Sequence, residues 1–168
     1  MTLPSDQQLH DHAAAFGRRL LESRMKLASA ESCTGGWLAK VATEVPGSSD
    51  WFDCSFVAYS YDAKESMLGV QRVTLEKFGA VSAETVIEMV RGALSRSRAD
   101  VAVAITGIAG PGGGTRDKPV GTVWMAWAKG HHPPTAVMHQ FPGDRDAVRR
   151  ATVEVAIAGL EKLLSESR

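Results

Sequence analysis

The sequence predicts an α/β fold: a single-domain, three-layer α/β/α sandwich built on a mostly parallel, mixed central sheet. Segments with apolar residues at helical spacing alternate along the chain with short, nearly continuous apolar runs, which is the pattern of strands covered by helices on both faces. The chain has 168 residues, the size of one domain. It contains no internal repeat and no linker-like segment, so residues 1–168 are expected to form one unit.

The first part of the chain predicts a helix, a strand and a second helix. Ser5 and Gln8 form a capping-box pair, and the apolar residues after them predict a helix to about residue 23. Residues 26–32 (KLASAES) then predict a short strand. After the turn at residues 34–36, apolar residues at helical spacing predict a helix that ends before Pro46.

The middle of the chain predicts a second strand followed by helices. Residues 54–60 (CSFVAYS) are rich in β-branched and aromatic side chains, so a second buried strand is expected there. A short helical segment is expected at residues 62–68. Ser82 can cap a further helix, whose apolar stripe predicts that it runs to about Arg98.

Residues 101–106 (VAVAIT) predict the central strand, because a continuous apolar run is typical of a strand covered on both faces. The glycine-rich segment 107–118 follows as a loop. Two more strands are expected at residues 120–129 and 135–141, and one edge of the sheet is expected to be antiparallel. Asp144 then caps a C-terminal helix with apolar residues at helical spacing.

Composition and charge exclude several classes of partner. Nineteen basic residues balance nineteen acidic ones, so no net charge draws the chain to nucleic acid or to an anionic membrane. No stretch approaches the roughly 20 apolar residues of a membrane span, and the polar first twelve residues lack the apolar core of a signal peptide. The two cysteines are too few for a disulfide framework. A cytoplasmic protein with reduced thiols is therefore expected.

Three polar or glycine-rich turns follow strands, at the edge of the sheet where α/β proteins bind ligands. The first, residues 31–36 (ESCTGG), enters a helix whose free backbone N–H groups favour an oxyanion or a phosphate; equally, it could be a helix cap with glycines that relieve a tight turn. The second, residues 59–64 (YSYDAK), places a tyrosine and a lysine five residues apart. The third, residues 106–114 (TGIAGPGGG), could bring backbone close to a ligand or form a flexible surface loop.

Metal catalysis and a histidine-based triad are disfavoured. The five histidines lie on the first helix, in a proline-bounded turn and in the last strand, and none has ligand spacing with a carboxylate or a thiol. No metal or other cofactor is expected, and lysine is a better candidate than histidine for a general base. Cys33, beside Ser32, could be a rival nucleophile, but a packing role is favoured because no histidine or lysine partner is assigned to it.

The three turns together carry a family resemblance. AESCTGG at residues 30–36, Tyr59-Ser60 with Lys64 and LGV at 68–70, and TGIAGP at 106–111 with PVGT at 119–122 resemble the CinA C-terminal domain family, which includes nicotinamide mononucleotide deamidases. The resemblance covers residues 8–165 and is to the stand-alone form, without the N-terminal domain of larger CinA proteins. It implies hydrolysis of the carboxamide of nicotinamide mononucleotide to nicotinate mononucleotide and ammonia, a salvage step that needs no metal. It also suggests a homodimer.

The resemblance implies roles for individual residues. It makes Ser32 the nucleophile, Lys64 and Tyr59 the groups that activate it, and Thr106 a pocket residue near the reacting centre. Amide hydrolysis by a serine needs a base and oxyanion donors, for which backbone N–H groups of the Ser32 turn and of Thr106-Gly107 are the candidates. Lys64 must then have a lowered pKa. The residues expected to bind substrate are Thr34, Gly35, Gly36, Gly107, Gly110 and Arg145.

Arg145 matches a family position, and its guanidinium fork suits the substrate phosphate. The alternative is a surface arginine paired with Asp144 or Asp146. Tyr61 departs from the family, which commonly has asparagine there, so an amidase for another small amide stays open.

A non-catalytic nucleotide-binding or regulatory module is the alternative from a different functional class. The presence of Ser32, Tyr59 and Lys64 together favours an enzyme, because a pocket that only binds has no chemical need for all three.

Overall fold

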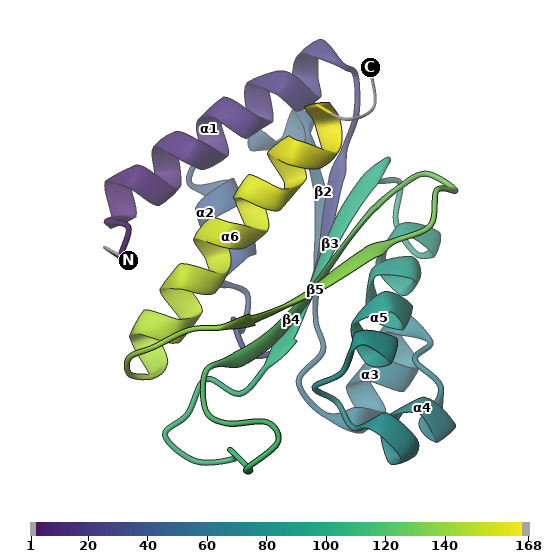
Figure 1. Cartoon of the computed structure of the whole chain (residues 1–168). Coiled ribbons are helices and arrows are strands. Elements are labelled where there is room, and N and C mark those ends of the chain that lie inside the picture. Colours follow the sequence, from purple (N-terminus) through teal and green to yellow (C-terminus); the bar gives the residue numbers. More distant parts are fainter. Residues whose placement is uncertain (1–2, 166–168) are drawn as a thin grey trace.

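The computed structural model describes residues 3–165 and consists of a five-stranded sheet with helices on both faces (Figure 1). The strands are β1 (Leu27–Glu31), β2 (Phe52–Val57), β3 (Val101–Gly107), β4 (Thr122–Lys129) and β5 (Thr135–Gln140). The α-helices are α1 (Asp6–Glu22), α2 (Trp37–Thr43), α3 (Tyr61–Leu68), α4 (Arg72–Phe78), α5 (Ala83–Ser95) and α6 (Arg145–Ser165), with a 3-10 turn, η1 (Ser48–Asp50). The predicted three-layer α/β/α sandwich is confirmed.

The strands lie in the order β2-β1-β3-β4-β5. β2, β1 and β3 are parallel, and β4 runs antiparallel to both of its neighbours. The reversed strand is thus one position in from the edge, because β3, β4 and β5 follow one another in space as a meander. The parallel half of the sheet brings the ends of β1, β2 and β3 to one edge, where the three sequence turns begin.

Three details differ from the sequence prediction. β2 begins at Phe52 and ends at Val57, and its residues are half-buried because it is an edge strand. α4 was not predicted; its N-cap residue, Gln71, makes no side-chain capping hydrogen bond, so the usual start signal is missing. α5 ends at Ser95, three residues before the predicted end.

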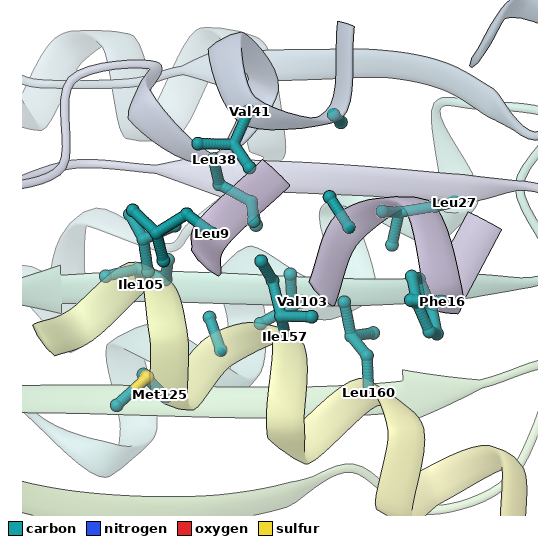
Figure 2. Packing of buried hydrophobic residues seen from close by; sticks show 14 of the residues in the cluster. Leu9, Phe16, Leu27, Leu38, Val41, Val103, Ile105, Met125, Ile157 and Leu160 are labelled. Atoms are coloured by element: carbon teal, nitrogen blue, oxygen red, sulfur yellow. The ribbon is translucent and has the colours of Figure 1, made fainter. Parts of the chain in front are cut away.

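Strand β3 shows how the sequence separates two cores. Its larger side chains point to one face of the sheet and its alanines to the other, as the period of two in a strand requires. The larger side chains join a core with α1, α2 and α6, in which Phe16, Ile105 and Leu160 are completely buried or nearly so (Figure 2).

The alanine face allows α5 to lie close against the sheet, and α3 and α4 pack against α5 on the same side (Figure 1). Met89 and Val90 of α5 are completely buried in this second core. At Gly92, a Cβ atom would lie only 2.0 Å from the carbonyl oxygen of Leu68, so α5 crosses the end of α3 with no room for a side chain. Among residues 3–165, no helix has the length and apolar composition needed to span a bilayer.

Candidate active site

The turn between β1 and α2 carries Ser32, and its position is fixed from both ends. The Ser32 N–H donates to the carbonyl of Ile105 on β3 (3.0 Å), which extends the β1–β3 pairing one residue beyond β1. The Gly35 N–H then donates back to the Ser32 carbonyl (3.0 Å) and closes the turn. Ser32 is 8% exposed, so it is largely shielded from water at this edge of the sheet.

The amine of Lys64 meets this hydroxyl. Ser60 caps α3 by accepting a hydrogen bond from the Ala63 N–H (3.0 Å), so Lys64 lies in the first turn of the helix. Its Nζ lies 2.9 Å from Ser32 Oγ and donates to the carbonyls of Ala58 (2.8 Å) and Tyr59 (3.3 Å). Serine and lysine therefore share one site, although 31 residues separate them in the sequence and they come from opposite helical layers.

Burial changes the acidity of Lys64. The side chain is 1% exposed, and removal from water lowers the pKa of its amine from 10.5 to about 8. No carboxylate within residues 3–165 forms an ion pair with it that would counteract this shift. At pH 7 about one Lys64 amine in ten is then neutral, compared with fewer than about one in a thousand for an ordinary lysine.

Tyr59 and Arg145 meet at the rim of the site. The Tyr59 side chain is 61% exposed, and its hydroxyl accepts a hydrogen bond from Arg145 Nη2 (3.1 Å). Arg145 Nη1 donates to the carbonyl of Gly110 (2.9 Å). The structure therefore joins the second and third turns through Arg145 rather than pairing this arginine with Asp144 or Asp146. A proton relay through the Tyr59 hydroxyl would require this side chain to move, since no hydrogen bond within residues 3–165 joins this hydroxyl to Ser32 or Lys64.

The third turn begins at the buried end of β3. Thr106 is 1% exposed, and its hydroxyl donates to the carbonyl of Ala80 (2.8 Å), which ties β3 to the segment before α5. A Cβ at Gly107 would lie 2.8 Å from the carbonyl oxygen of Thr122. Gly110 has φ +86, and a Cβ there would lie 2.6 Å from Val120 Cγ1. Glycine is required at both positions by the close return of the chain into β4.

The start of α2 is not open to a substrate anion, contrary to the expectation from the sequence. The N–H groups of Gly36, Leu38 and Ala39 donate to the carboxylate of Glu31, so the chain supplies its own anion. The Thr34 hydroxyl is buried and also donates to Glu31 (2.8 Å). Gly35, with φ +60, is exposed at the outside of this turn.

Neither Cys33 nor a metal cluster competes with Ser32. Burial raises the pKa of the Cys33 thiol to about 12, which keeps it protonated and packed in the core at neutral pH. Within residues 3–165, no group of three or more potential ligands is placed to hold a metal ion.

Two residues of the site were missed by the sequence analysis. Glu31 was noted as part of the ESCTGG segment and given no role; a lone acid at the end of a buried strand, a few residues before a helix, was the available signal. Arg149 of α6 donates to the carbonyls of Cys33 (3.1 Å) and Thr34 (2.9 Å). No local pattern marks Arg149, because its partners lie more than a hundred residues away in the sequence.

The geometry can be compared with known proteins. The family model of the CinA C-terminal domain matches residues 9–164, almost the whole described chain. The chain belongs to this family. The nicotinamide-nucleotide amidohydrolase PncC of Escherichia coli is 48% identical over 156 residues, which are 93% of this chain and 94% of that protein. The protein of the same name from Pseudomonas putida is 49% identical over 154 residues, covering 92% of this chain and 96% of its own length.

A solved structure of similar sequence has the same architecture. The competence/damage inducible protein CihA from Agrobacterium tumefaciens superposes with a TM-score of 0.91 at 43% identity. The match covers 97% of this chain and 98% of that one, so the shared fold extends over both layers of helices.

Proposed function

We propose that this CinA-family chain is a nicotinamide-nucleotide amidohydrolase that converts nicotinamide mononucleotide to nicotinate mononucleotide and ammonia. The observation that carries the proposal is the 2.9 Å contact between Ser32 Oγ and the buried amine of Lys64. Relatives with the name of this activity match almost the full length of the chain, which supports the choice of substrate.

Lys64 is proposed as the general base. Its Nζ has three neighbours: two carbonyls, which only accept hydrogen bonds, and the Ser32 hydroxyl, which can also donate. In the neutral amine, the two N–H groups can donate to Ala58 and Tyr59, and the lone pair is left facing the Ser32 hydroxyl. The carbonyls thus orient the base as well as bind it.

Ser32 is proposed as the nucleophile. As its Oγ bonds to the carboxamide carbon, its proton passes to Lys64, and the same proton then assists departure of the amide nitrogen as ammonia. Water then attacks the acyl ester while Lys64 accepts its proton, and Lys64 returns this proton to Ser32 Oγ as the C–O bond breaks and the nicotinate product leaves. The N–H groups of Ser32, Gly35 and Gly36 are already bound within the protein, which leaves those of Cys33, Thr34 and Thr106-Gly107 as the proposed oxyanion donors.

The substrate class is tested by measuring ammonia release from nicotinamide mononucleotide, nicotinamide riboside and free nicotinamide. The proposal predicts that the phosphorylated compound has the highest kcat/KM. Release from a different small amide, but not from nicotinamide mononucleotide, would favour an amidase of other specificity; Tyr61, half exposed at the start of α3, is the family departure that would explain it. If none of the three is cleaved, a non-catalytic binding module is favoured.

Arg145 is proposed to bind the substrate phosphate together with the third turn, residues 106–114, to which it is hydrogen-bonded at Gly110. Arg145→Ala is expected to raise KM by about tenfold or more, since a charge-assisted hydrogen bond contributes roughly 1.5–3 kcal/mol. Nicotinamide riboside, which lacks the phosphate, should be cleaved equally well by the variant and the wild type. An unchanged KM for nicotinamide mononucleotide would remove Arg145 from the phosphate site.

A cytoplasmic homodimer is also proposed. Both cysteines are free, in agreement with a reducing compartment. Val137 and Met138 are exposed on the edge strand β5 and offer apolar surface to a second copy. Light scattering of the purified protein would give the oligomeric state directly.

A further inference from the structure

The carboxylate of Glu31 lies at the centre of the Ser32 turn, completely buried at 0% exposure. One oxygen, Oε2, accepts from the Thr34 hydroxyl (2.8 Å) and from the N–H groups of Gly36 (3.0 Å) and Leu38 (3.2 Å). The other, Oε1, accepts from the Ala39 N–H (2.9 Å) and lies 3.3 Å from the hydroxyl oxygens of Ser29 and Ser55, which are themselves hydrogen-bonded to each other (2.8 Å). Three backbone N–H groups, the Thr34 hydroxyl and a linked pair of serine hydroxyls thus surround one carboxylate.

This arrangement compensates a buried charge without a cation. A carboxylate in the interior is costly unless hydrogen bonds satisfy it, and here backbone and hydroxyl donors surround it. The N–H groups at the start of α2 would in turn lack partners without the carboxylate. Glu31 therefore ties the end of β1 to the first turn of α2, and Ser55 extends the connection to β2.

Ser32 lies inside the loop of chain that these bonds close. The bonds of Glu31 fix residues 34–39 after Ser32, and Arg149 also holds the carbonyls of Cys33 and Thr34 in the same turn. No hydrogen bond joins Glu31 to Ser32 Oγ or to Lys64 Nζ within residues 3–165. Any effect of Glu31 on the serine is thus transmitted through the backbone of the turn.

We propose that Glu31 is a positioning residue: its buried carboxylate fixes the turn at residues 32–36 so that Ser32 Oγ is held at 2.9 Å from Lys64 Nζ. The inference rests on the proposed role of Ser32 as the nucleophile. It assigns Glu31 to the rate of the chemical step and not to substrate binding, because the carboxylate is buried and every donor around it belongs to the protein. It also explains why the start of α2 is not available to a ligand.

Glu31→Gln is the sharpest variant, because it keeps the shape and changes the hydrogen bonding. The amide nitrogen of glutamine can only donate, so it cannot replace Oε2, which faces two N–H groups. Its better orientation is towards Oε1, where the hydroxyls of Ser29 and Ser55 can turn to accept but the Ala39 N–H loses its partner. The first turn of α2 should then shift, and the serine with it.

The test combines kinetics with covalent labelling of the serine. Glu31→Gln is expected to lower kcat for ammonia release by about tenfold to a hundredfold and to leave KM within about twofold, as expected when a reacting atom is misplaced. Labelling of Ser32 by a fluorophosphonate probe should slow by a similar factor. The pH at half-maximal rate should stay where it is in the wild type, because Glu31 does not contact Lys64. All rates are measured well below the melting temperature of the variant.

Glu44→Gln is the matched control, because Glu44 is exposed just after α2 and pairs with Lys40. It should keep the wild-type kcat. If Glu31→Gln does not fold, Thr34→Val provides the second variant: it removes one donor to Glu31 with little change of shape and should also lower kcat with KM maintained.

A folded Glu31→Gln protein with wild-type kcat and labelling rate would overturn the inference and leave Glu31 with a role in stability alone. A change in KM without a change in kcat would also overturn it. If the wild type is labelled at Ser32 but releases no ammonia from nicotinamide mononucleotide, the proposed substrate is wrong while the labelling rates still test Glu31. A wild type that is neither labelled nor active would overturn both.

Discussion

Lys64→Met is expected to lower kcat for ammonia release by about a thousandfold or more, while making the protein more stable at pH 7. The loss of activity follows from removing the base that activates Ser32, and Ser32→Ala should cause a loss of similar size. In the wild type, kcat/KM should rise with pH and level off above about pH 8, because the neutral amine is the active form. Kinetic measurements from pH 6 to 10 check both points, and an active Lys64→Met protein would exclude the lysine mechanism.

Lys64→Met should raise the free energy of unfolding, although it lowers activity, because the wild type buries an amine that is more stable when it is charged and in water. Below pH 8 the native state must hold the protonated amine in the interior, and the shift of its pKa from 10.5 to about 8 corresponds to roughly 3 kcal/mol. Methionine removes this penalty but leaves the carbonyls of Ala58 and Tyr59 without their donor, a cost of about 1–2 kcal/mol. The net increase in the free energy of unfolding should be about 1–2 kcal/mol at pH 7.

The same reasoning fixes the pH dependence. Between pH 8 and 10.5 the unfolded chain still binds the proton that the native state has lost, so the wild type gains stability as pH rises through this window. Urea unfolding should therefore show that Lys64→Met is more stable than the wild type at pH 7 and that this difference in the free energy of unfolding disappears at pH 10. Lys77→Met is the control, because Lys77 is exposed on α4 and should change neither activity nor stability. A variant that is less stable at pH 7 would contradict the buried charge.

Gly92→Ala is expected to lower the free energy of unfolding by about 2–4 kcal/mol. The new Cβ would lie 2.0 Å from the carbonyl oxygen and 2.8 Å from the carbonyl carbon of Leu68. Both are backbone atoms, so no side-chain rotation can relieve the overlap, and α5 must separate from the end of α3. The melting temperature should fall by roughly 4–16 °C for a domain of this size.

Gly112→Ala is the matched control, since a Cβ at Gly112 has no atom within 4 Å. It should melt like the wild type. Because α3 carries Lys64, Gly92→Ala should also lower kcat at temperatures where the protein remains folded. An unchanged melting temperature would contradict the close approach of the two helices.

The sequence predicted elements where one local pattern determines the structure. The continuous apolar run of β3 and the apolar stripe of α5 identify a central strand and the helix that covers it, and the Ser5 capping box marks the start of α1. The half-burial of β2 was missed, because its composition does not reveal that it lies at an edge. α4 was missed for lack of a capping signal.

For the site, the sequence located the three turns but did not show which of their side chains form hydrogen bonds with one another. That Ser32 and Lys64 meet depends on the order of β2, β1 and β3. The resemblance supplied the roles of the two residues, and spacing supplied neither the strand order nor the pairing. The contact of the Tyr59 hydroxyl with Arg145 and the contact of Glu31 with Ser55 are interactions between distant parts of the chain. Local periodicity contains no information about them.

Ser32 lies in the turn before α2, and Lys64 lies in α3, which packs in the layer on the other face of the sheet. The reactivity of the serine should therefore report whether the layer that carries Lys64 has separated from the sheet. If α3, α4 and α5 detach as a unit while β1 and α2 stay folded, Lys64 returns to water and becomes an ordinary, protonated lysine. The serine would then lose its base before the remaining core melts. Chemical labelling of this one hydroxyl during heating should thus fade ahead of the loss of helical signal, and the gap between the two would measure how tightly the second layer is attached.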